Sequence, residues 1–309
     1  MSKLFFLRPA KITLTITYRQ VRRFSNIPRP EAVSPLAFDL HAPSNPRTNE
    51  RTSPILFLHG LFGSKKNNRG ISKALTRDLG LYVYALDLRN HGESPHNLRH
   101  DYVAMAEDVS NFIHEHELKD PILIGHSMGA KTAMSLALRS PQLVAKLIAV
   151  DNAPVDANLG RTFATYVQGM KKIQAANVAR QNEADKILQD YEESLPIRQF
   201  LLGNLSRSPE DGIQRFRIPL DILGRSLDYL GDFPYKDPNQ IRYEKPALFV
   251  RGTQSHYVPD DVLPIIGQFF PRFRIASVDA GHWLISEQPE AFRQAVVDFI
   301  RDPEHVGYE

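Results

Sequence analysis

Short apolar runs alternate with longer segments of helical periodicity from Pro54 onward. This alternation is typical of a mostly parallel β-sheet with helices on both faces, because consecutive parallel strands need a crossover connection between them. We therefore predict an α/β fold. The expected strands are Leu36–Leu40 (antiparallel), Ile55–Leu58, Tyr82–Asp87, Pro121–Gly125, Ala145–Val150, Ala247–Val250 and Arg274–Val278, and the expected helices are Asn68–Asp78, Tyr102–His116, Met128–Arg139 and Pro289–Ile300.

Residues 152–245 interrupt this alternation. They contain long helical patterns at Arg161–Ala176 and Val178–Tyr191, several prolines that break regular structure, and no convincing strand. We interpret the segment as a helical cap inserted into an α/β domain that spans residues 31–309.

Residues 1–30 differ in composition from the rest of the chain. They contain seven basic residues, several hydroxyl side chains and neither Asp nor Glu. This composition is typical of a mitochondrial transit peptide. The segment Arg22–Ser25 also resembles the cleavage pattern of the matrix protease. We predict import into mitochondria, with the matrix as the destination, and cleavage near Phe24–Ser25; a basic arm without a targeting role is the alternative.

Charge and composition exclude several classes of protein. The net charge is +3, but seven positive charges lie in residues 1–30, so residues 31–309 carry a net charge of −4. A mildly acidic body gives no electrostatic reason to bind nucleic acid. Cysteine is absent, which excludes disulfides and thiolate sites. No run reaches the roughly 18 consecutive apolar residues of a membrane-spanning helix. We predict no nucleic-acid partner and no spanning segment.

The most specific motif is G-x-S-x-G at residues 125–129, which lies between an expected strand and an expected helix. A serine on such a tight turn has a strained backbone that exposes its hydroxyl, and the flanking glycines let strand and helix approach closely. The N-terminus of the following helix favours developing negative charge. Ser127 is therefore a candidate nucleophile, and an ordinary turn without chemistry is the alternative.

A second glycine-containing loop, H-G-L-F-G at residues 59–63, follows the strand Ile55–Leu58. Glycines at the carboxyl end of a strand let backbone N–H groups point inward, as an oxyanion hole requires. The expected donors are the backbone N–H groups of Leu61 and of Met128, the residue after the nucleophile. An ordinary strand-to-helix turn is the alternative interpretation.

The order of these motifs resembles the α/β-hydrolase superfamily over nearly all of residues 36–301. In chain order, these motifs are the glycine loop, D-x-R-x-H-G-x-S at residues 87–94, the serine motif, and Gly281-His282-Trp283 near the end of the chain. Details around residues 59–68 and 251–255 resemble a mitochondrial branch that includes the α/β-hydrolase domain 11 proteins, small bacterial esterases and fungal ethanol acetyltransferases. The resemblance implies an α/β-hydrolase fold with an inserted helical cap.

The general base is expected at His282, which follows the last strand where these hydrolases place their histidine. His59, His91, His126 and His256 have no matching role as a base and are interpreted as loop or supporting residues.

The acidic residue that would orient His282 is harder to assign from the sequence. Most of the superfamily carries an acid after the strand that follows the cap, but Ser255 stands there. The related esterases and acetyltransferases use an aspartate after the preceding strand, which implies Asp151. The rivals are Asp260, Asp261 and Asp279, and a role for Asp151 in capping its own turn is the alternative.

These residues predict transfer of an acyl group through a serine ester, with Ser127, His282 and Asp151 as the catalytic residues. The expected substrates are short-chain carboxylic esters or thioesters, with water as the acceptor. An alcohol acyltransferase that uses acetyl-CoA is the alternative enzyme, and a non-catalytic binding or stabilising partner in mitochondria is the alternative of another class. No histidine pair has metal-ligand spacing in a helix or ribbon, so we predict no metal. We also expect no cofactor.

Overall fold

A seven-stranded sheet forms the centre of the compact unit that covers residues 31–309. The computed structural model describes residues 33–44, 53–156 and 159–302. Strand β1 is antiparallel to its neighbour and the other strands are parallel. In sheet order the strands are β1 (Phe38–His41), β3 (Val83–Leu86), β2 (Ile55–Leu58), β4 (Ile122–His126), β5 (Lys146–Val150), β8 (Ala247–Gly252) and β9 (Phe273–Val278).

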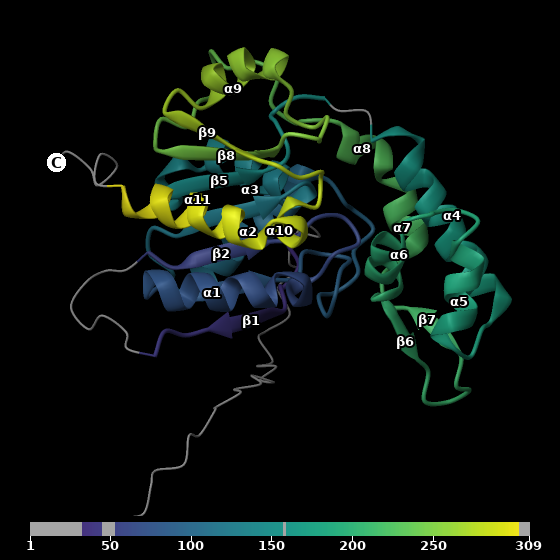
Figure 1. Cartoon of the computed structure of the whole chain (residues 1–309). Helices are drawn as coiled ribbons and strands as arrows, with labels where there is room; N and C mark the ends of the chain where they lie inside the picture. Colours follow the sequence, from purple (N-terminus) through teal and green to yellow (C-terminus); the bar gives the residue numbers. More distant parts are fainter. Residues whose placement is uncertain (1–32, 45–52, 157–158, 303–309) are drawn as a thin grey trace, which may run out of the picture. The chain divides into compact units, whose positions relative to one another are not determined.

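Helices cover both faces of this sheet (Figure 1). One face packs on α1 (Arg69–Leu79) and α11 (Pro289–Arg301) through side chains such as Phe57, Leu75 and Phe292. The other packs on α2 (Tyr102–Glu115), α3 (Met128–Arg139) and α9 (Leu263–Phe269). Each fully buried Leu, Ile or Phe stabilises the fold by about 1.5–3 kcal/mol. The arrangement confirms the predicted α/β architecture, including the antiparallel first strand.

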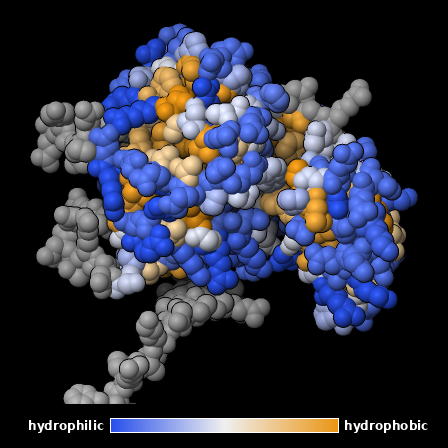
Figure 2. Space-filling model, viewed as in Figure 1, coloured by the Kyte–Doolittle hydropathy of each residue, from blue (hydrophilic) through white to orange (hydrophobic). Residues whose placement is uncertain are grey.

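The inserted segment forms a helical cap between β5 and β8 (Figure 1). Figure 2 shows apolar residues gathered mainly on the side of the cap that faces the sheet. The cap elements are α4 (Gly160–Ala176), α5 (Gln181–Leu188), α6 (Leu195–Leu202), β6 (Leu205–Arg207), β7 (Gln214–Phe216), α7 (Leu220–Arg225) and α8 (Leu227–Gly231).

Two buried side chains of the sheet domain hold the end of the cap. The Tyr102 hydroxyl donates to the Leu230 carbonyl at 2.7 Å, and the Lys131 ammonium donates to the carbonyls of Gly231 and Asp232 at 3.0 Å. Burial lowers the pKa of Lys131 to about 8. A cation at the carboxyl end of a helix compensates the carbonyls that lack intrahelical partners.

The structure differs from the sequence prediction mainly in the cap. The helix expected at Val178–Tyr191 is shorter, because Arg180 is extended and the helix begins at Gln181. The segment predicted to lack strands contains the β6–β7 hairpin, whose three-residue strands carry exposed polar side chains and no apolar alternation. Among the described residues, no helix is long and apolar enough to cross a membrane.

Asp101 is the N-cap of α2, since its side chain accepts from the Ala104 N–H. Short 3₁₀ turns connect other elements, namely η1 (Lys65–Asn68), η2 (Pro141–Leu143) and η3 (Asp260–Val262), and α10 (Leu284–Glu287) precedes α11. The segment predicted to be a transit peptide lies outside the described residues.

Candidate active site

Ser127 lies on a strained turn between β4 and α3. Its φ of 54° and ψ of −112° are unfavourable for a residue with a side chain. The flanking glycines make this turn sterically possible. A Cβ atom on Gly125 would lie 2.1 Å from the Gly129 carbonyl oxygen, and one on Gly129 would lie 2.5 Å from the Leu58 carbonyl oxygen. The G-x-S-x-G spacing therefore has the steric cause that the sequence indicated.

The structure brings Ser127, His282 and Asp151 together in one hydrogen-bonded chain. The Ser127 Oγ lies 3.0 Å from His282 Nε2, and His282 Nδ1 lies 2.6 Å from Asp151 Oδ2. The parallel register explains this convergence, because Val150 pairs with both His126 and Val250. The residues that follow these strands consequently meet at one edge of the sheet. In this tautomer, Nδ1–H donates to the carboxylate and Nε2 is free to accept the serine proton.

Ser255 supports the carboxylate from the position where most of the superfamily carries its acid. The Ser255 hydroxyl donates to Asp151 Oδ2 at 2.5 Å, and the Gly252 N–H donates to Oδ1 at 3.1 Å. Asp151 is fully buried, and these two donors give each of its side-chain oxygens a hydrogen bond. The ring of Tyr257 stacks on the His282 imidazole with a centroid distance of 4.1 Å. Sequence reasoning missed both supporting roles, because the Ser255 contact depends on the pairing of β5 with β8 and the Tyr257 contact on the pairing of β8 with β9.

The capping role considered for Asp151 belongs to its neighbour. Asn152 Oδ1 accepts from the Ala153 N–H at 2.9 Å, and Asn152 Nδ2 donates to the Ser127 carbonyl at 3.2 Å. Asn152 therefore closes the turn and ties it to the serine loop. The sequence signal for this role is an Asx residue before Ala-Pro, and two such residues, Asp151 and Asn152, stand there side by side.

The rival aspartates lie elsewhere. Asp260 is exposed on η3 and pairs with Arg251 at 2.5 Å, while Asp261 is exposed on the same turn. Asp279 accepts from Thr253 and Gln254. None of these three carboxylates is hydrogen-bonded to the His282 ring, whose partners are Asp151 and Ser127.

The glycine loop after β2 presents a backbone donor next to the serine. The Gly60 carbonyl accepts from the Gly63 N–H at 2.9 Å and from His59 Nδ1 at 2.8 Å. Because the N–H and C=O groups of a trans peptide point in opposite directions, the Leu61 N–H points away from both donors. Within the described part of the chain, the N–H groups of Leu61 and Met128 have no hydrogen-bond partner. A Cβ atom on Gly60 would lie 3.4 Å from Ser127 Cβ, so the loop packs directly on the serine.

The other histidines have structural contacts. His126 Nε2 donates to the His282 carbonyl at 2.8 Å, and burial, with His282 nearby, lowers the pKa of His126 to about 4. His59 accepts from the Leu88 N–H and His91 from the Phe62 N–H, and burial lowers the pKa of each ring. His256 is exposed. At neutral pH the buried rings are therefore uncharged members of the loops around the site.

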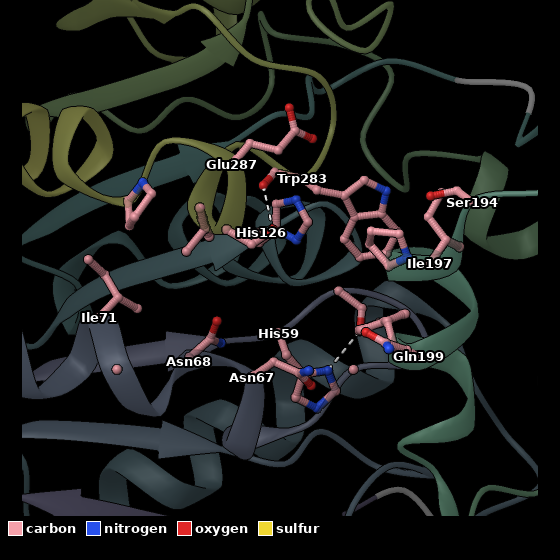
Figure 3. Close-up of a pocket in the computed structure, with 18 residues that line it drawn as sticks. His59, Asn67, Asn68, Ile71, His126, Ser194, Ile197, Gln199, Trp283 and Glu287 are labelled. Carbon is pink, nitrogen blue, oxygen red and sulfur yellow. Dashed lines mark hydrogen bonds between the residues drawn. The ribbon is translucent and has the colours of Figure 1, made fainter. Parts of the chain in front are cut away.

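A pocket of about 860 Å³ adjoins the serine (Figure 3). His126 and Trp283 lie on one side of it, and His59, Asn67 and Asn68 lie on the other. The cap contributes Ser194, Ile197, Gln199 and Phe200 at one end. Ser127 itself does not line this space; Gly60 and His126, which do, are its immediate neighbours. The Trp283 and Phe200 rings meet edge to face at 4.6 Å and join the histidine loop to the cap.

Comparison with known proteins shows the family of the chain. Residues 53–289 match the family model described as alpha/beta hydrolase fold. A probable alcohol acetyltransferase from Saccharomyces cerevisiae is 43% identical over 267 residues, which cover 80% of this chain and 77% of that protein. The sn-1-specific diacylglycerol lipase ABHD11 of Xenopus laevis is 38% identical over 80% of this chain and 79% of the lipase. The solved structure of a marine microorganism esterase superposes with a TM-score of 0.78 at 33% identity, covering 86% of this chain and 99% of the esterase. On these matches, the protein is a member of the α/β-hydrolase fold family.

Proposed function

We propose that the protein is a serine hydrolase that cleaves short-chain esters or thioesters through an acyl-enzyme on Ser127. The observation that carries the proposal is the unbroken chain from Ser127 Oγ through His282 to Asp151, with distances of 3.0 and 2.6 Å. Nucleophile, base and orienting acid are within hydrogen-bonding reach of one another, as acyl transfer requires. The related lipase and esterase support ester hydrolysis.

In the acylation step, Ser127 Oγ forms a bond to the substrate carbonyl carbon and its proton passes to His282 Nε2. The carbonyl oxygen becomes an oxyanion, which the N–H groups of Leu61 and Met128 stabilise. Collapse breaks the bond to the leaving group, which takes the proton from His282. Water then attacks the acyl-serine carbonyl carbon and gives a proton to His282. Collapse of this second tetrahedral intermediate breaks the bond between the acyl carbon and Ser127 Oγ, and His282 returns the proton to Oγ, which regenerates the free hydroxyl and releases the acid. A fluorophosphonate probe tests this directly, because it should label Ser127 and no other serine.

The acceptor distinguishes hydrolysis from the alternative activity. An alcohol could replace water in the second step, and the related alcohol acetyltransferase favours this second candidate. Among the described residues that line the pocket, Glu287 is the one acidic side chain, and neither Lys nor Arg is present. A pocket of this character suits a neutral ester or alcohol better than the phosphates of a coenzyme A thioester.

We expect neutral short-chain esters to be turned over faster than acetyl-CoA. The measurement is a series of p-nitrophenyl esters of increasing chain length, with acetyl-CoA as the alternative donor, on protein that lacks residues 1–24. Each donor is assayed with and without ethanol, and both the free acid and the ethyl ester are quantified. Ethyl acetate formed from acetyl-CoA as the dominant product would instead make the acyltransferase the principal activity.

The composition of residues 1–30 supports a mitochondrial location as part of the proposal. We expect protein recovered from mitochondria to begin near Ser25, because import would be followed by removal of the basic segment. N-terminal sequencing of the recovered protein is the measurement. A chain that still begins at Met1 and is found in the cytosol would contradict the targeting role.

A further inference from the structure

Phe62, in the middle of the glycine loop, has an unusual backbone. Its φ is 62°, in the left-handed region that side chains disfavour, and it is almost fully buried. It directly follows Leu61, whose N–H is the proposed oxyanion donor. A strained residue next to this donor needs contacts that hold it in place.

The two hydrogen bonds of Phe62 come from different parts of the fold. Its N–H donates to His91 Nε2 at 3.1 Å, and the opposite nitrogen of His91 donates to the Arg89 carbonyl at 2.9 Å. Its carbonyl accepts from Asn204 Nδ2 at 2.8 Å. His91 belongs to the sheet domain, whereas Asn204 lies between α6 and β6 of the cap. Both side chains are at least nine-tenths buried.

Asn204 is itself fixed within the cap. Its side chain also donates to the Leu201 carbonyl at 3.2 Å, and its own carbonyl accepts from the Arg217 N–H at 3.0 Å. The Phe62 ring meets Phe163 of α4 with a centroid distance of 6.2 Å. A displacement of the cap would therefore release the Phe62 carbonyl and one side of its ring together.

We propose that Asn204 and His91 are positioning residues for the oxyanion hole. Asn204 holds the Phe62 backbone from the cap and His91 holds it from the sheet domain, so that docking of the cap orients the Leu61 N–H toward the oxyanion. The inference rests on the proposed function and adds to it a coupling between the cap and the oxyanion hole. Neither residue needs to touch the substrate, because each acts through the backbone of the glycine loop.

The sharpest test replaces Asn204 by an isosteric group that cannot donate. In Asn204→Asp we expect kcat to fall about 10- to 100-fold with KM within about twofold, because a misaimed donor weakens the transition state more than the bound substrate. The affinity for a short-chain trifluoromethyl ketone, which forms an oxyanion on the serine, should fall by a similar factor. Asn182→Asp, on the exposed surface of α5, makes the same charge change in the cap and should leave all three values unchanged.

Two further variants keep the result interpretable. Asn204→Ala removes the donor without adding a charge and serves if the aspartate variant does not fold. His91→Leu removes the acceptor of the Phe62 N–H and should lose more kcat than His91→Gln, whose amide oxygen can still accept. A rise in KM with kcat and ketone affinity unchanged would overturn the proposal and leave Asn204 as a simple anchor of the cap. Failure of the proposed function is separate, since Ser127→Ala would then retain activity.

Discussion

Ser127→Ala should abolish turnover, with a loss on the order of 10⁴-fold or more. The substitution removes the oxygen that would attack the carbonyl, and no other side chain in the described hydrogen-bond chain can replace it. The substitution removes only the hydroxyl oxygen and keeps the Cβ atom. Alanine is also no more strained than serine at the φ of 54°. We therefore expect the folded structure to persist. The measurement is the rate of p-nitrophenyl ester hydrolysis together with thermal unfolding.

A matched control is Ser206→Ala, which removes an exposed hydroxyl from the cap hairpin. It should keep both full turnover and fluorophosphonate labelling, whereas Ser127→Ala should lose both. If the Ser127 variant kept more than a few per cent of the activity, the acyl-serine mechanism would have to be abandoned.

The sequence was sufficient for the sheet and for the residues with strong local signals. The serine could be located because the close approach of strand and helix excludes side chains on Gly125 and Gly129. His282 could be located because it follows the last strand of a parallel sheet, and the carboxyl ends of such strands meet at one edge. In both cases the physical cause acts within a few residues of the motif.

Contacts between distant segments could not be predicted in the same way. Ser255 meets Asp151 only because β5 and β8 are neighbours in register, although 104 residues separate them. Asn204 meets Phe62 across 142 residues and depends on where the cap docks. The β6–β7 hairpin was missed for a local reason, since strands of three residues are too short to show periodicity.

The assignment of the acid gives the second large expected effect. Asp151→Asn should lower kcat by roughly 10⁴-fold, the scale for loss of the acid in such a triad. The carboxylate of Asp151 accepts from three donors, namely Ser255, the Gly252 N–H and His282 Nδ1. Ser255 and His282 Nδ1 share Oδ2, whereas the Gly252 N–H donates to Oδ1. An amide must therefore direct its NH₂ group either at the Gly252 N–H or at Ser255 and His282 together. If it faces His282, the ring changes tautomer and Nε2 can no longer take the serine proton.

The controls are Asp260→Asn and Asp261→Asn, which should be nearly silent because both carboxylates are exposed and away from the ring.

A double variant tests whether a carboxylate near His282 is what the enzyme needs. Ser255 Oγ lies 2.5 Å from Asp151 Oδ2, so adding Ser255→Asp to Asp151→Asn returns a carboxylate to the neighbourhood of His282 and should restore part of the lost kcat. Inactivation by Asp260→Asn or Asp261→Asn, with Asp151→Asn still active, would instead place the acid after the cap, as in most of the superfamily.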